Sequence, residues 1–87
     1  MSAQLQFEPI APQREALTLA DLDAVLAVEN SAYAFPWTRG NFIDSLAAGY
    51  SAKLLRDPGG LPCAYCVAMA GVQEFHLLNL TVAPAWQ

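Results

Sequence analysis

Two cysteines are spaced in a way that can support chemistry. Cys63 and Cys66 form the C-x-x-C pattern that proteins use for disulfide exchange or zinc binding. A zinc site needs a second pair of ligands, and a redox pair normally begins a helix; the sequence offers neither. The pair lies in an apolar run that predicts a strand, where residues three apart point to opposite faces. We therefore interpret both as buried free thiols and predict no metal site.

His76 is the single histidine, and its imidazole could titrate near neutral pH as a general acid or base. The alternative is a half-buried structural residue in a strand. Over residues 74–82 the period of two places Asn79 and Thr81 on the face opposite to His76. Because neither face is wholly apolar or wholly polar, we expect this strand to be covered on both sides.

Three aromatic side chains gather in the segment Tyr33-Ala34-Phe35-Pro36-Trp37. Aromatic residues on a loop can form the wall of a substrate site. They can also form a hydrophobic plug on the elements that the loop connects. The residue types favour the plug and leave the wall open.

Two helices are predicted on either side of that segment. Thr18, with Asp21 three residues later, begins the first helix over residues 19–32. Pro36 ends it by forcing extended backbone on the preceding residue. Thr38 caps a second, short helix that Gly49 ends. Helical spacing predicts the apolar faces of the two helices: Leu19, Leu22, Val25, Leu26, Ala32 and Tyr33 in the first, and Phe42, Ile43, Leu46 and Ala47 in the second.

The remaining elements are predicted as strands. Residues 13–17 are short enough for a first strand, and period-two stretches follow at 50–57, 63–71 and 74–82. Pro58-Gly59-Gly60 predicts a tight turn between the second and third strands. The order is strand, two helices and a three-strand antiparallel meander, which is an α+β fold. We divide the chain into a flexible leader, 1–12, and one domain, 13–87.

Composition restricts the class of function. The chain has 87 residues, 55% hydrophobic and 14% charged, with a net charge of −4, so it lacks the basic patch that nucleic-acid binding needs. No stretch is long and apolar enough for a membrane span, and no secretory signal begins the chain, which predicts a cytoplasmic protein. Between Pro58 and Gln87 the one charged residue is Glu74. This apolar excess predicts self-association through an exposed strand.

Two segments carry a family resemblance: Tyr33-Ala34-Phe35-Pro36-Trp37 and Leu78-Asn79-Leu80-Thr81-Val82-Ala83-Pro84-Ala85-Trp86-Gln87. They resemble the amino-terminal half of the GNAT-superfamily N-acetyltransferases, and in particular the RimI-like members. These have an A-F-P-W turn between the first two helices and an N-I-A-V-x-P-x-[YW]-[QR] strand end. The resemblance spans residues 13–87 and implies a partial GNAT domain, truncated before the acyl-CoA pyrophosphate loop.

The resemblance also implies a site. The pantetheine arm of acetyl-CoA would run along the backbone of Leu80, Thr81 and Val82, like an added strand. Gln87 would begin the pyrophosphate loop, whose other residues are not in this chain. Phe35 and Pro36 would line the peptide-substrate side, with Trp37 packed beneath the turn. The general base and acid of RimI-like enzymes would belong to the second half, so we predict no catalytic residue here.

The function that the resemblance implies is acetyl transfer from acetyl-CoA to the N-terminal alanine of a ribosomal protein. We expect the 87 residues by themselves to be inactive. Two alternatives stay open: a small interaction module that self-associates through the edge of residues 74–82, and a GNAT enzyme that acetylates a small-molecule amine.

Overall fold

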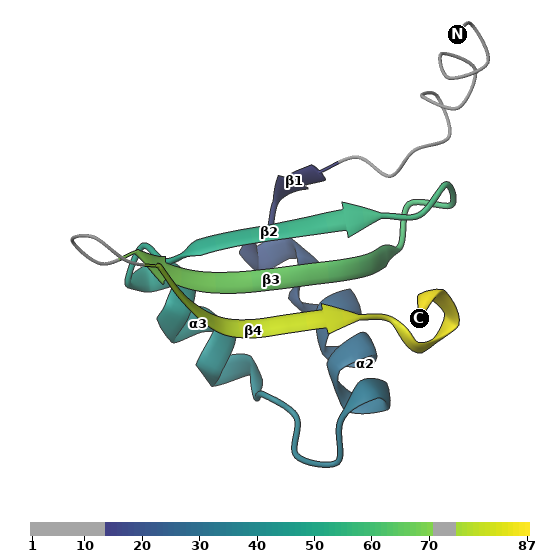
Figure 1. Cartoon of the computed structure of the whole chain (residues 1–87), viewed down its shortest axis with the longest axis horizontal. Helices are drawn as coiled ribbons and strands as arrows, with labels where there is room; N and C mark the ends of the chain where they lie inside the picture. Colours follow the sequence, from purple (N-terminus) through teal and green to yellow (C-terminus); the bar gives the residue numbers. More distant parts are fainter. Residues whose placement is uncertain (1–13, 71–74) are drawn as a thin grey trace, which may run out of the picture.

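The protein, as a computed structural model that describes residues 14–70 and 75–87, is a two-layer α+β fold (Figure 1). One antiparallel sheet has the order β1-β2-β3-β4. Its strands are β1 (Arg14–Ala16), β2 (Ser51–Arg56), β3 (Pro62–Ala70) and β4 (Phe75–Val82), and its helices are α2 (Leu22–Ala32) and α3 (Arg39–Ala47). The predicted fold class and order of elements are confirmed, whereas the proposed leader, 1–12, lies outside the described residues.

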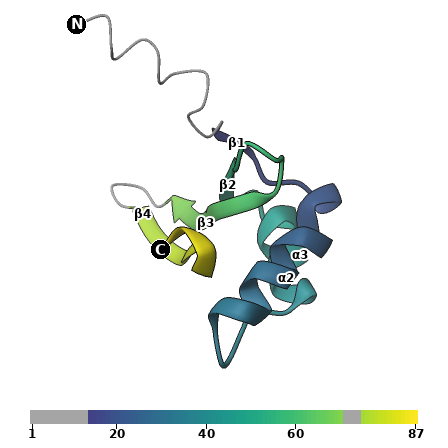
Figure 2. The ribbon, with the colours of Figure 1, turned by 90° about the vertical axis from the view of Figure 1, so that its right-hand side faces the viewer.

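Both helices lie on one face of the sheet (Figure 2). The core between the layers is built from apolar side chains of both: Leu17, Leu22, Val25, Phe42, Ala52, Leu54, Tyr65 and Val67. On the opposite face, no described element covers the sheet. Leu80 there is 59% exposed, and Leu78 and Val82 are also exposed. The apolar excess of the sequence therefore lies partly on this bare face.

The first helix begins later than its sequence pattern predicts. Thr18 and Asp21 do form the capping box, in which the Thr18 amide donates to the Asp21 carboxylate at 2.8 Å. The first turn, Leu19–Asp21, is however a 3₁₀ helix, η2. Leu19 is 62% exposed, so its predicted place in the core is wrong. A tighter turn rotates its residues away from the α-helical face that follows.

The second helix follows the prediction closely. The Thr38 side chain accepts a hydrogen bond from the Asn41 amide at 3.2 Å, which caps α3. Gly49 follows the helix with a φ of +80°, a conformation that glycine adopts without a steric penalty. Phe42 is fully buried, whereas Ile43 is 40% exposed and is not a core residue. With 11 residues, α2 is the longest described helix, and no described helix is long enough to cross a membrane.

Strand β4 contains a break in register that the sequence does not reveal. Val67 pairs with Asn79 but Ala68 pairs with Leu77, so Leu78 is an extra residue in β4. Such a bulge bends a strand and changes which face the preceding side chains take. Only Asn79 and Thr81 of the strand are buried, and Phe75 to Leu78 are all exposed. The expectation that β4 is covered on both sides is therefore wrong for the described residues.

The cysteine pair lies in β3 as predicted. Both thiols are free; Cys63 is buried and Cys66 is partly exposed, as expected for residues on opposite faces. Burial, with a smaller contribution from Asp57, raises the pKa of Cys63. Cys63 is thus held as a neutral thiol within the strand.

An ion-pair cluster ties the start of the chain to the sheet. Arg56 contacts Glu15 at 3.0 Å and Asp21 at 2.7 Å, which joins β1, η2 and β2. Burial by itself would raise the pKa of Asp21. The hydrogen bonds from Thr18 and the ion pair with Arg56 outweigh it and hold the pKa below the ordinary value of 3.8.

This cluster predicts a pH-dependent contribution to stability. Because the folded-state pKa of Asp21 is lowered, its carboxylate stabilises the fold above pH 3.8, and this contribution is lost as the pH falls through the folded-state pKa. The difference in unfolding free energy between the wild type and Asp21→Asn should therefore shrink between about pH 6 and about pH 2, as measured by urea unfolding. A difference that stays constant or grows on acidification would contradict this account.

Candidate functional site

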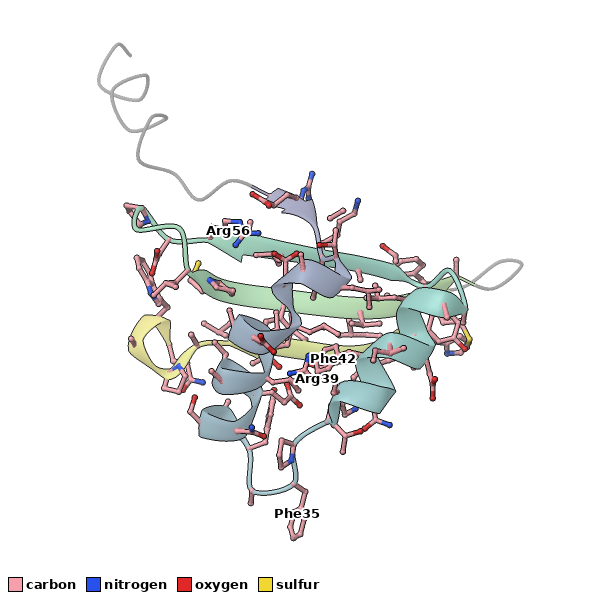
Figure 3. All side chains as sticks on the ribbon, turned by 180° about the vertical axis from the view of Figure 1, so that it is seen from behind. Phe35, Arg39, Phe42 and Arg56 are labelled. Atoms are coloured by element: carbon pink, nitrogen blue, oxygen red, sulfur yellow. The ribbon has the colours of Figure 1, made fainter. Side chains whose placement is uncertain are left out.

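The aromatic turn between α2 and α3 has two different parts. Phe35 is 96% exposed and projects from the tip of the turn, away from the sheet (Figure 3). Trp37 is partly buried and packs edge-to-face on Phe42, with ring centroids 5.0 Å apart. Pro36, between them, is half-buried. Trp37 is therefore the plug beneath the turn, and Phe35 is left free to contact another molecule.

The outer edge of β4 presents main-chain groups in an ordered way. Ala83 donates its amide to the Cys63 carbonyl, so odd positions at the end of β4 face β3. Leu80 and Val82 face the other way. The Leu80 carbonyl accepts from the Tyr33 hydroxyl at 2.9 Å, and the Val82 carbonyl accepts from Nε2 of Gln87 at 2.9 Å. With both carbonyls bonded within the chain, the edge offers the Leu80 and Val82 amides as donors.

Thr81 and Gln87 have supporting positions in this arrangement. Thr81 is buried and faces the helices, with its hydroxyl 2.7 Å from Oδ1 of Asn79 and 3.0 Å from the Tyr33 hydroxyl. Gln87 follows the 3₁₀ turn η3 (Pro84–Trp86), which folds the chain back to the strand. The four sequence-predicted positions on β4 and η3 are thus brought together at one edge.

A buried carboxylate that the sequence analysis missed lies between this edge and the turn. Glu29 of α2 is 2% exposed. Its carboxylate accepts from the Trp37 amide at 2.9 Å, from the Tyr65 hydroxyl at 2.5 Å and from the Asn79 amide group at 3.3 and 3.4 Å. Burial, and then the hydrogen bond to Glu29, raise the pKa of Tyr65, so its phenol remains a donor.

One signal in the sequence could have located Glu29. It follows Leu22 by seven positions and Val25 by four, so helical periodicity places it in the buried stripe. All three are buried in α2. A charged residue in an apolar stripe is a reason to look for hydrogen-bond partners, because unpaired burial of a carboxylate is very costly.

A cavity of about 280 Å³ lies between the aromatic turn and β4. Side chains of both elements and of α2 line it: Glu29, Tyr33, Phe35, Trp37, Leu78, Asn79 and Leu80. A larger apolar hollow, about 450 Å³, lies on the sheet and is lined mainly by β2 and β3. The smaller cavity is the better candidate site, because it joins an exposed aromatic residue to unpaired strand amides and a buried polar network.

His76 lies apart from this cavity. It pairs with Met69 across the β3–β4 ladder, and its side chain is exposed. Among residues 14–70 and 75–87, no three His, Cys, Asp or Glu side chains cluster as metal ligands would. The described chain therefore places hydrogen-bond donors and apolar surface in the candidate site, and no residue that is clearly a proton-transfer catalyst.

Comparison with known proteins gives one informative match. Neither the protein-family models nor the curated proteins match the chain. Among solved structures, the ribosomal-protein-S18-alanine N-acetyltransferase from Escherichia coli matches with a TM-score of 0.78 and 28% sequence identity over 87% of this chain. The match covers 48% of that enzyme, so this chain spans about half of its length.

The chain folds as part of a GNAT acetyltransferase. The resemblance inferred from residues 33–37 and 78–87 is thereby confirmed at the level of the fold. In this partial GNAT fold the two segments that suggested the family are in contact, since Tyr33 donates to Leu80. They are separated by 47 positions in the sequence.

Proposed function

We propose that this chain is the amino-terminal part of a cytoplasmic acetyl-CoA-dependent N-acetyltransferase that acetylates the N-terminal alanine of a ribosomal protein. The observation that carries the proposal is the match in both structure and sequence to an enzyme of that activity. Its site supports the proposal, because an exposed loop aromatic and a strand edge with outward amides flank one cavity.

In this proposal acetyl-CoA lies along the outer edge of β4. The Leu80 and Val82 amides donate to the pantetheine arm, as main-chain groups do when an extended ligand adds to a sheet edge. Thr81 holds the strand from the helix side, and Gln87 begins the turn toward the pyrophosphate. An outward amide near Leu80 is also suited to stabilise the oxyanion that forms when an amine attacks the thioester.

The acceptor peptide lies on the other wall of the cavity, against Phe35 and Pro36. Acetyl transfer requires a neutral amine as the nucleophile and a proton for the departing thiol. We assign neither of these roles to a residue of this chain. The 87 residues alone are therefore proposed to be inactive, and self-association through the bare strand stays a prediction that light scattering can test.

The proposal is tested by an acetyl-transfer assay on the full-length gene product. With acetyl-CoA and a peptide that begins with alanine, we expect the peptide to gain one acetyl group, detected by mass spectrometry. The same peptide with a blocked N-terminus is the control and should not react. The 87-residue chain should show no transfer. A polyamine acetylated in preference to the peptide would instead favour the small-molecule alternative.

A further inference from the structure

We propose that Glu29 is a positioning residue that fixes the acceptor-side turn, residues 33–37, against the acyl-CoA strand β4. This role rests on the proposed function for its chemistry, but its geometry stands by itself. Glu29 is on α2, and its carboxylate binds the main chain of the turn and side chains of both β3 and β4. One buried group thus contacts all the elements that surround the candidate cavity.

The hydrogen-bond pattern requires a carboxylate at this position. Oε2 accepts from the Trp37 amide, Oε1 accepts from the Tyr65 hydroxyl, and the Asn79 amide group donates toward both oxygens. All partners are donors, so both oxygens must be acceptors. A glutamine would turn one acceptor into a donor and leave a buried donor facing it. No ion pair to Glu29 occurs among the described residues, so these neutral donors hold its charge.

The network continues from Glu29 to the strand edge. Asn79 directs its amide group at the carboxylate and its Oδ1 accepts from the Thr81 hydroxyl. That hydroxyl lies 3.0 Å from the hydroxyl of Tyr33, which donates to the Leu80 carbonyl. A continuous chain of hydrogen bonds therefore connects the amide of Trp37 with the carbonyl of Leu80.

This connection has a specific consequence for the two substrates. Strand β4 is also held by its ladder to β3, so it keeps its place when the carboxylate is removed. The turn has less support, because the Trp37 amide is bonded to Glu29 itself. Loss of the carboxylate should therefore disturb the acceptor side of the cavity more than the acetyl-CoA side.

The first experiment measures amide hydrogen exchange by NMR in this chain. In Glu29→Gln, the Trp37 amide should exchange at least about tenfold faster, because it loses its acceptor. The Ala83 amide, which donates to Cys63 in the β3–β4 ladder, should change less than about twofold. Asp23→Asn, an exposed acid on the same helix, is the matched control and should leave both rates unchanged. Equal acceleration at Trp37 and Ala83, or no change at Trp37, would overturn the proposal.

A second measurement needs no variant and so does not depend on whether Glu29→Gln folds. In the wild-type chain, a scalar coupling through the hydrogen bond should connect the Trp37 amide nitrogen with the Glu29 carboxyl carbon. Its absence would show that the carboxylate does not hold the turn.

The kinetic test uses the full-length gene product. Glu29→Gln should raise the KM for the alanine peptide at least about fivefold, with the KM for acetyl-CoA within about twofold of wild type. A purely structural role would instead lower the amount of active enzyme and leave both KM values unchanged. If the wild-type protein transfers no acetyl group, the proposed function fails, whereas the exchange and coupling measurements still decide the role of Glu29.

Discussion

Replacing Phe42 with alanine is expected to lower the unfolding free energy by about 3–5 kcal/mol. Phe42 is fully buried between α3 and the sheet, and its ring lies edge-to-face with Trp37 and with Tyr65, at centroid distances of 5.0 and 6.0 Å. The substitution removes all ring contacts and leaves a cavity that the sheet cannot easily close. A small domain has about 5–15 kcal/mol of stability in total, so much of this chain should then unfold.

Urea unfolding followed by circular dichroism measures this effect, and Ile43→Ala provides the matched control. Ile43 is the next residue of the same helix but is 40% exposed. Its truncation should cost less than about 1.5 kcal/mol, because less apolar surface returns to water. Equal losses for the two variants would show that α3 does not pack on the sheet through Phe42.

Local signals account for the parts of the fold that could be predicted from the sequence. Thr18 and Thr38 begin helices because their side chains satisfy amides within three residues, and Gly49 ends one because it tolerates a positive φ. The strands follow from period-two stretches separated by turns. Each of these choices depends on a few neighbouring residues, which a sequence displays directly.

The features that escaped prediction depend on distant partners. Glu29 can be buried only because Tyr65 and Asn79, 36 and 50 positions away, supply donors to its carboxylate. The bulge at Leu78 arises from the pairing of β4 with β3, and it decides which β4 side chains reach the core. Neither follows from the propensity of a single segment.

The same distinction applies to the candidate site. Phe35, Pro36, Leu80, Thr81, Val82 and Gln87 were predicted from a family resemblance, and the fold brings their two segments to one cavity. The resemblance gives no reason for Tyr33 to bond Leu80, or for Gln87 to bond Val82. Those contacts determine that the β4 edge presents amides and not carbonyls, and they became visible only with the structure.

Replacing Leu80 with proline is expected to weaken acetyl-CoA binding by the full-length gene product by about tenfold or more. Proline lacks the amide proton, and a ligand acceptor left unpaired at the strand edge loses about 1–3 kcal/mol, where 1.4 kcal/mol corresponds to tenfold. The strand should tolerate the change, because the amide of Leu80 points away from β3 and proline is accepted at such edge positions. The preceding residue, Asn79, already has the extended conformation that proline requires.

Isothermal titration calorimetry with acetyl-CoA, compared between Leu80→Pro and Leu80→Ala, separates the amide from the side chain. Leu80→Ala removes the exposed leucine side chain but keeps the amide, so its affinity should stay within about threefold of wild type. Equal affinity for the proline and alanine variants would mean that acetyl-CoA does not use this amide. If the proline variant alone loses affinity, the bonds from Tyr33 and Gln87 gain a functional explanation: they occupy the edge carbonyls, so that a ligand at β4 meets donors alone.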